Sequence, residues 1–217
     1  MSAVVEIWSD LHCPWATTAT MRLRAARDAL GLDVVLDQRP WPLEWVNERG
    51  TPRHLVAPET AVLANHEPDV FGAYRSESWP STFLPAFELV AAARRVGGLR
   101  AAEEVDAAVR LRFFRHGEDV SLRHVLRRAA ADAAAAHPCV DADAVLRCWE
   151  TEPVRADVVA DVERSRALPI TGSPQVFWPD GTTTHNPGFD VEWVRGIPVV
   201  RSDDRDACAR LLRQTLR

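Results

Sequence analysis

A cysteine stands near the start of the chain with an acid and a histidine beside it, in the order Asp10-Leu11-His12-Cys13. Thiolate, rather than thiol, is the form of cysteine that attacks sulfur, so the pKa of Cys13 decides its reactivity. His12 could favour the thiolate as a cation or accept its proton as a neutral base, or it could be an exposed loop residue. Asp10 could be a semi-buried acid behind the sulfur or a residue that closes a turn. This stretch is the candidate catalytic centre.

The elements on either side should place this cysteine at the start of a helix. Residues 3–8 form an apolar run typical of a strand, and small or apolar residues then recur every three or four positions from Pro14 to about Leu30. Proline suits the first helical position because its missing N–H would have no partner there. Free N–H groups and the positive end of the helix dipole should therefore face the sulfur. In comparable positions thiol pKa values fall from about 8.5 to roughly 3.5–7.5, and we expect the same of Cys13.

The rest of the chain alternates between α/β and helical patterns. Residues 33–38 read as a second strand, which makes a βαβ unit with parallel strands and a right-handed crossover. Residues from about 48 to 80 read as irregular, and four helices should follow between about Phe83 and Trp149, the first of them ending at Gly97-Gly98. A helix over about 153–167, an antiparallel hairpin over 175–185 around Asp180-Gly181, and a helix over about 204–216 complete the prediction.

An early strand, a Cys-Pro-X-X turn, a long helix and the late segment Thr171-Gly172-Ser173-Pro174-Gln175-Val176-Phe177 occur here in one order. With Asp180-Gly181 and His185-Asn186-Pro187-Gly188, this set resembles the DsbA-like branch of the thioredoxin superfamily. It is similar in particular to members related to 2-hydroxychromene-2-carboxylate isomerase and kappa-class glutathione transferases. The resemblance implies an α/β fold, a thioredoxin-like βαβ–ββα sheet with an all-helical insertion. Residues 1–48 and 151–217 would form the two halves of the thioredoxin-like domain, and residues 49–150 the insertion.

The resemblance also implies roles for individual residues. Pro174 would be a cis-proline that faces Cys13, and Ser173 before it would offer backbone groups to an extended substrate or a thiol cofactor; a trans proline at a strand start is the alternative. Pro14 and Trp15 would border the same binding groove. Trp41 and Trp45 either line this cleft or belong to the core.

The sequence departs from the dithiol pattern at Ala16, which stands where the second cysteine of a Cys-X-X-Cys pair would be. Such a pair releases its mixed disulfide by attack of the second thiol, which this motif cannot do. An external small thiol could resolve the intermediate, a distant cysteine could do so, or no protein disulfide forms at all. Cys148 and Cys208 lie on apolar helical stripes and favour burial, which leaves Cys139 as the most plausible distant thiol.

Composition and charge limit the kinds of partner that we expect for this protein. The formal net charge of −5 gives no basic surface for nucleic acid, and no apolar run approaches the roughly 18 residues that span a bilayer. The N-terminus has no basic region of the signal-peptide kind, so we expect a cytoplasmic protein without structural disulfides. The cysteines at 13, 139, 148 and 208 show no metal-binding spacing, and we predict no metal and no bound cofactor.

Three functions fit these observations. The first is a DsbA-like thiol-disulfide oxidoreductase with the single catalytic cysteine Cys13, cleared by a low-molecular-weight thiol such as glutathione or mycothiol. Its partners would be a small thiol or disulfide or a protein disulfide, with a homodimer as one option. The second is a glutathione- or mycothiol-type transferase or isomerase, and the third is a non-catalytic thioredoxin-like binding module. Related transferases commonly carry serine at position 13, which counts against the second.

Overall fold

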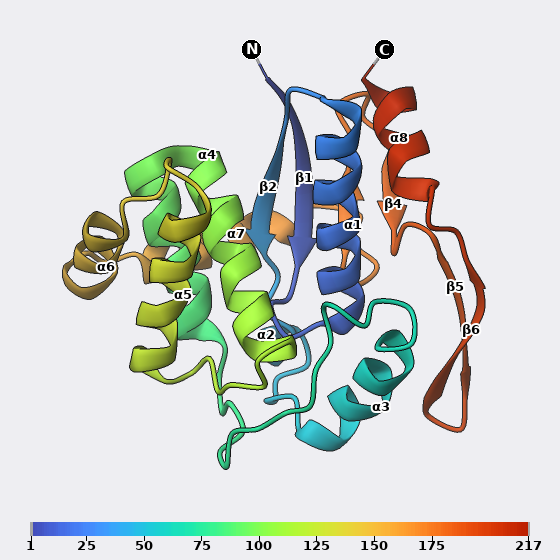
Figure 1. The fold of residues 1–217 in the computed structure, drawn as a ribbon, viewed down its shortest axis with the longest axis horizontal. Coiled ribbons are helices and arrows are strands. Elements are labelled where there is room, and N and C mark those ends of the chain that lie inside the picture. Colours follow the sequence, from blue (N-terminus) through green and yellow to red (C-terminus); the bar gives the residue numbers. More distant parts are fainter. Residues whose placement is uncertain (1, 217) are drawn as a thin grey trace.

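The computed structural model describes residues 2–216, and a four-stranded sheet forms its centre (Figure 1). Strands β1 (Ala3–Ser9) and β2 (Val34–Pro40) are parallel and are joined by helix α1 (Pro14–Leu30). Strands β3 (Gln175–Phe177) and β4 (Thr183–His185) form an antiparallel hairpin, and β3 pairs antiparallel with β1. The order β2-β1-β3-β4 is the predicted βαβ–ββα arrangement, which confirms the fold class.

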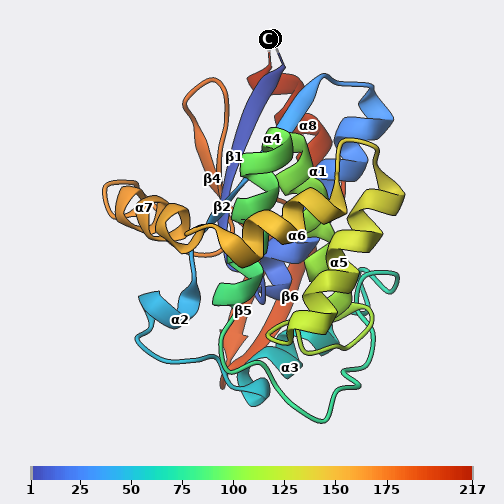
Figure 2. The same ribbon diagram turned by 90° about the vertical axis from the view of Figure 1, so that its left-hand side faces the viewer.

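Helices cover both faces of this sheet (Figures 1 and 2). Helix α1 and the C-terminal helix α8 (Ala207–Thr215) enclose one apolar core, in which Ile7, Leu23 and Leu212 are fully buried. The other helices are α2 (Leu43–Val46), α3 (Arg53–Leu63), α4 (Leu84–Phe114), α5 (Arg123–Ala136), α6 (Ala142–Thr151) and α7 (Arg155–Ser165). Helix α7 lies on the opposite face of the sheet. Helix α4 runs along the edge strand β2, where its Glu103 side chain accepts the N–H of Leu36, and carries α5 and α6 on its outer side. The domain boundaries at residues 48 and 150 remain predictions.

Helix α1 begins and ends at the predicted residues because its caps are encoded locally. Cys13 is the N-cap residue with extended backbone, Pro14 follows at the first helical position, and Gly31 takes a left-handed conformation at the C-terminus. The N–H of Gly31 donates to the carbonyl of Asp28, which closes the last turn. The position of Cys13 at the start of a helix therefore follows from the sequence alone.

The first two predicted helices of the insertion are the two arms of α4. The chain runs helically on both sides of Gly98, whose φ of 71° and ψ of −163° break the helix there. A Cβ atom at Gly97 would lie 2.6 Å from the Cβ of Ala101 and 2.9 Å from the carbonyl oxygen of Cys139. The glycine pair thus permits a sharp bend and a close approach that larger residues would prevent.

Three segments differ from the prediction. Residues 48–80 are not irregular throughout, because α3 occupies Arg53–Leu63 with Pro52 as its N-cap and Pro58 inside it. Proline is tolerated at the start of a helix, which accounts for Pro52, whereas Pro58 lies within α3 at the cost of one backbone hydrogen bond. Strand β2 continues to Pro40, which pairs with Ser9 at the end of the sheet.

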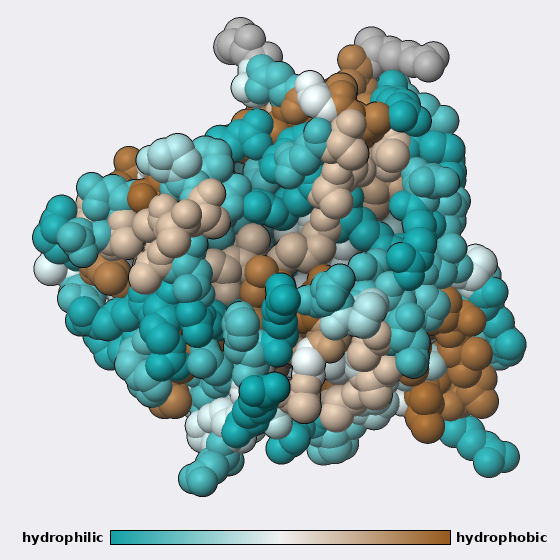
Figure 3. All heavy atoms as spheres, in the orientation of Figure 1, coloured by the Kyte–Doolittle hydropathy of each residue, from teal (hydrophilic) through white to brown (hydrophobic). Residues whose placement is uncertain are grey.

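The third difference is an additional antiparallel hairpin, which the sequence analysis did not assign. It is formed by β5 (Phe189–Val194) and β6 (Ile197–Asp203) and extends beyond the sheet (Figure 1). Its tip exposes Trp193, Val194 and Ile197, and apolar atoms gather in that region of the surface (Figure 3). Its base is fixed to α1, where the guanidinium of Arg22 donates to the carboxylate of Asp203 and lies 4.5 Å from the ring centre of Phe189.

Candidate active site

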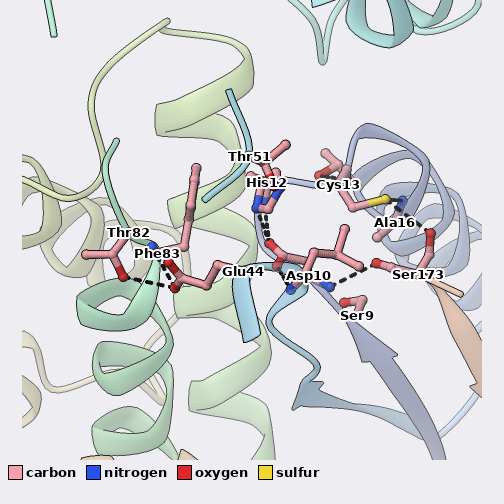
Figure 4. Close-up of polar contacts among 12 residues, drawn as sticks. Ser9, Asp10, His12, Cys13, Ala16, Glu44, Thr51, Thr82, Phe83 and Ser173 are labelled. Carbon is pink, nitrogen blue, oxygen red and sulfur yellow. Dashed lines mark hydrogen bonds and ion pairs between the residues drawn. The ribbon is translucent and has the colours of Figure 1, made fainter. Parts of the chain in front are cut away.

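The sulfur of Cys13 lies between the start of α1 and the segment that precedes β3 (Figure 4). Its Sγ is 3.1 Å from the carbonyl oxygen of Ser173, to which the thiol donates, and it accepts a long hydrogen bond of 3.5 Å from the N–H of Ala16. The Ser173–Pro174 peptide bond is cis. Residues 13 and 173–174 therefore meet as the sequence resemblance implied, although the catalytic and binding roles remain predictions.

The environment of Cys13 is opposite to the one expected. Its side chain is only 6% exposed, and burial raises the pKa of the thiol to about 12, with the nearby carboxylates of Glu59 and Asp10 also raising it. Side-chain hydrogen bonding with Ser173 and the N–H of Ala16 lower the pKa but do not compensate. The prediction of a thiolate at neutral pH is wrong for the resting protein, because removal of water disfavours the charged form more than the helix start favours it.

Glu59 of α3 is a member of the site that the sequence analysis missed. Burial raises the pKa of its carboxyl group to about 7, against the opposing effects of the Trp15 side chain and the charge of His12. Its carboxylate is the strongest electrostatic influence on the Cys13 thiol after burial itself. Glu59 was not found because it lies in the segment assigned as irregular, where no periodicity linked it to residue 13.

Asp10 acts as a structural acid at the end of β1. Its carboxylate accepts the N–H groups of His12, at 2.8 Å, and of Leu43, at 2.5 Å, and so joins the turn before α1 to α2. Its own N–H donates to the hydroxyl of Ser173 at 2.9 Å, which also ties this turn to the cis-proline segment (Figure 4). Asp10 is fully buried, and its carboxylate also closes the turn by accepting the N–H of His12, so its role in the chemistry remains a prediction.

His12 is fully enclosed, so it is not an exposed loop residue. Its Nδ1 lies 2.5 Å from Oδ1 of Asp10, yet neither ring nitrogen has a hydrogen-bond partner of normal geometry among residues 2–216. The ring packs against that of Phe83, with 4.5 Å between centres. The side chain therefore faces Asp10 and the helical region, while the sulfur of Cys13 faces Ser173.

Arg110 of α4 binds the turn that precedes α1, and the sequence analysis did not identify it. Its buried guanidinium pairs with Asp106 at 2.6 Å and donates to the carbonyl of Asp10 at 3.0 Å and the hydroxyl of Ser9 at 2.8 Å. Two of these partners lie 100 or more residues away in sequence, so no local motif could reveal them. Helix α4 thus fixes the turn between β1 and α1 through one buried guanidinium.

The predicted groove residues divide into two groups. Pro14 is buried at the start of α1, and the buried Trp15 packs edge-on against Phe189 of the additional hairpin at 5.5 Å between ring centres. Trp41 and Trp45 instead line another cavity with residues of α7 and the segment after it. Cys13 does not line that cavity, although Trp45 also packs against the hydrophobic cluster that contains Cys13. A role of the two tryptophans in the cysteine cleft remains a prediction.

All four cysteines are free. Cys208 is buried beneath the sheet, where burial raises its pKa to about 11, while Cys139 and Cys148 are half-buried with pKa values also raised by burial.

Within residues 2–216, no cluster of three or more His, Cys, Asp or Glu could hold a metal ion. In the same part of the chain, no helix has the length and hydrophobicity needed to cross a membrane.

This combination of sheet, cysteine turn and proline segment defines a DsbA-like thioredoxin domain. The family model of the DSBA-like thioredoxin domain matches residues 4–195, and the chain belongs to this family. No curated protein matches the sequence.

Solved structures give the same fold over nearly the whole chain. The cytosolic disulfide reductase DsbM from Pseudomonas aeruginosa is 23% identical with a TM-score of 0.63, and the match covers 98% of each chain. A probable DsbA oxidoreductase from Streptomyces coelicolor is 21% identical with a TM-score of 0.62, covering 99% of this chain and 90% of that one. A 2-hydroxychromene-2-carboxylate isomerase is 12% identical with a TM-score of 0.61, covering 83% and 87%.

Proposed function

We propose that this protein is a thiol-disulfide oxidoreductase that works with one cysteine, Cys13. The observation that carries the proposal is the position of its sulfur at the N-cap of α1, 3.1 Å from the carbonyl oxygen of Ser173 and next to Pro174. Family membership supports oxidoreductase or isomerase chemistry at this site. Ala16 in the fourth position of the motif leaves Cys13 without a local resolving thiol.

The exchange would run in two balanced steps. Cys13 loses its proton and attacks one sulfur of a disulfide, forming a Cys13 mixed disulfide while the other sulfur leaves as a thiolate and takes a proton. A low-molecular-weight thiol then attacks the substrate sulfur of this mixed disulfide, which forms a new disulfide and returns the Cys13 thiol. Glutathione or mycothiol is the co-substrate we propose. A structure of DsbM was determined with GSH, which supports this class of thiol.

Activation must then accompany substrate binding, because the resting thiol is protonated. A substrate backbone N–H that donates to the carbonyl of Ser173 would compete with the thiol for this acceptor. The neutral thiol would lose the hydrogen bond that favours it. Glu59, whose pKa lies at about 7, would accept the proton near neutral pH, directly or through water.

The test is mass spectrometry of the intact protein after incubation with glutathione disulfide, with mycothiol disulfide and with a model disulfide. We expect one adduct on wild type and on Cys139→Ser, its removal by the matching reduced thiol, and no adduct at position 13 in Cys13→Ser. An unmodified Cys13 under all three conditions, with the protein folded, would refute the exchange reaction and favour a binding module.

The neutral state of Cys13 favours one alternative, a transferase or isomerase that activates the thiol of a bound cofactor. A protonated side chain with its pKa raised to about 12 can donate a hydrogen bond to a bound thiolate without forming a disulfide. Calorimetry with reduced glutathione and mycothiol separates the two reactions. Tight binding that persists in Cys13→Ser, without any mixed disulfide in the wild type, would establish this alternative.

We also propose a cytoplasmic location, a small or protein disulfide as substrate, and no nucleic-acid or membrane partner. DsbM is a cytosolic disulfide reductase, which supports the location. The net charge of −5 supports the exclusion of nucleic acid. A homodimer remains one option, which sedimentation of the intact protein would decide.

A further inference from the structure

A second cavity lies between α3, the segment that follows it and the end of α4. Its volume is about 370 Å³, within the range of pockets that hold small molecules. Neither Cys13 nor Ser173 lines it, so it is distinct from the candidate thiol site. Five aromatic side chains form much of the lining, namely Phe71, Tyr74, Trp79, Phe113 and Phe114.

These aromatic rings form one packed group. Phe113 lies 4.7 Å from Phe114, 5.3 Å from Trp79 and 5.8 Å from Tyr74 between ring centres. The three phenylalanines are buried, whereas Tyr74 and Trp79 are half-buried and therefore nearer the opening. Such a surface presents ring faces and edges that favour a flat aromatic ligand.

Close backbone contacts fix the wall of the cavity before any ligand binds. The N–H of Gly72 donates to the carbonyl of Phe114 at 2.8 Å, and the N–H of Arg75 donates to the carbonyl of Gly117 at 2.8 Å. A Cβ at Gly72 would lie 2.3 Å from the carbonyl oxygen of Arg115, and one at Gly117 the same distance from that of Ala73. The two glycines thus let this segment lie directly against the end of α4.

The polar side chains of the lining are mostly committed to the protein itself. Tyr74 donates to the carbonyl of Ser78, Trp79 to that of Thr51, and Thr60 to that of Val56. Such hydroxyl and indole groups therefore add little free donor capacity to the cavity.

Arg53 is different. It is the only charged residue of the lining, it is exposed, and its guanidinium lies 5.1 Å from the ring centre of Tyr74. Within residues 2–216, this ring is the guanidinium's recorded partner, and no hydrogen bond or ion pair engages it. An exposed cation whose only recorded contact is the Tyr74 ring, within residues 2–216, therefore lies beside an aromatic cavity.

We propose that this cavity binds a small aromatic carboxylate, with the rings in the aromatic lining and the carboxylate on Arg53. The assignment follows from the cavity's volume, its aromatic walls and a guanidinium in its lining that lies against Tyr74 and keeps its hydrogen-bond donors available. A planar guanidinium matches the two oxygens of a carboxylate, and the apolar walls exclude a strongly hydrated ligand. The site goes beyond the proposed thiol chemistry and does not depend on it.

The experiment is calorimetric titration of the full-length protein with naphthalene-2-carboxylate and with its neutral analogue, naphthalene-2-carboxamide. We expect one-to-one binding of the carboxylate and about tenfold weaker binding of the amide. Arg53→Gln should reduce carboxylate affinity to that of the amide. Ala61→Leu, which fills the cavity from the exposed face of α3, should weaken both ligands by about tenfold or more.

Two control variants test whether the change in ligand affinity comes from this cavity. Arg49→Gln removes an exposed arginine that does not line the cavity and should leave both affinities unchanged. Cys13→Ser should also bind normally, which separates this site from the thiol chemistry. Equal affinity of wild type for acid and amide, no binding of either, or carboxylate binding unaffected by Arg53→Gln would overturn the proposal. Arg53→Gln alters an exposed side chain, so this test remains decisive if Ala61→Leu fails to fold.

Discussion

The Cys13 thiol donates to the carbonyl oxygen of Ser173 across 3.1 Å, although 160 residues separate the two in the chain. This contact joins the start of α1 to the cis-proline segment before β3. It also uses the thiol as a donor, which requires the protonated form. The reactivity of the site therefore depends on what replaces this hydrogen bond.

The first prediction concerns alkylation of Cys13. Because burial raises the pKa of its thiol to about 12, its reaction with iodoacetamide should be slow at pH 7 and should rise about tenfold per pH unit up to pH 9 without a plateau. Peptide mass spectrometry measures this rate beside that of the half-buried Cys139. A plateau below pH 8 would show a stabilised thiolate and restore the expectation drawn from the helix start.

Glu59→Gln should make Cys13 more reactive. The Glu59 carboxylate raises the pKa of the Cys13 thiol, so its removal lowers that pKa and should accelerate alkylation at pH 8 roughly three- to tenfold. Glu77→Gln is the matched control, since Glu77 is exposed and does not act on this thiol. Equal acceleration in both variants would mean that Glu59 has no specific influence.

Glu59 should also make the free energy of unfolding depend on pH. The pKa of Glu59 rises from 4.5 to about 7 in the folded protein, so the folded state keeps a proton that the unfolded state has released. The stabilisation that protonated Glu59 gives the folded state should therefore be fully present below pH 4.5, decline as the pH rises towards 7, and be lost above it. The loss in free energy of unfolding should be on the order of 1–3 kcal/mol.

Urea denaturation of wild type and Glu59→Gln at pH 5 and pH 8 measures this difference. The variant should lose less stability than wild type between these two values, because glutamine does not titrate. Parallel curves for the two proteins would contradict the pKa assigned to the buried carboxyl group.

Arg110 should be needed for the stability of the cysteine turn. Arg110→Met leaves the carboxylate of Asp106 buried without its cation, together with the carbonyl of Asp10, and should reduce the free energy of unfolding by about 3–5 kcal/mol. The double variant Arg110→Met/Asp106→Leu should recover part of this loss, because it removes the uncompensated charge.

Urea denaturation of Arg110→Met, Asp106→Leu and the double variant tests this coupling. Arg115→Met, at an exposed position at the end of the same helix, should change stability by less than about 0.5 kcal/mol. If the double variant is as unstable as the sum of its two single variants, Arg110 and Asp106 do not act as a pair.

Several local features were predictable because short-range rules govern them. The proline after Cys13 and the glycine at position 31 delimit α1, and the Asp180-Gly181 turn produces the hairpin of β3 and β4. Helix α3 was missed because prolines were taken as evidence against regular structure. The β5–β6 hairpin was missed although β5 alternates apolar and polar residues, which is a strand signal present in the sequence itself. Its partner β6 does not alternate and begins with Ile197-Pro198, which hid the pairing.

The sequence by itself determined that Cys13 begins a helix, that position 16 holds no second thiol, and that a Ser-Pro pair opens the late hairpin. Only the tertiary structure decided the ionisation of the sulfur, because burial and the carboxylate of Glu59 act through space from elements distant in the chain. It likewise decided that Arg110 would hold the turn. Helix caps depend on neighbouring residues, whereas desolvation and buried charge depend on how whole elements pack.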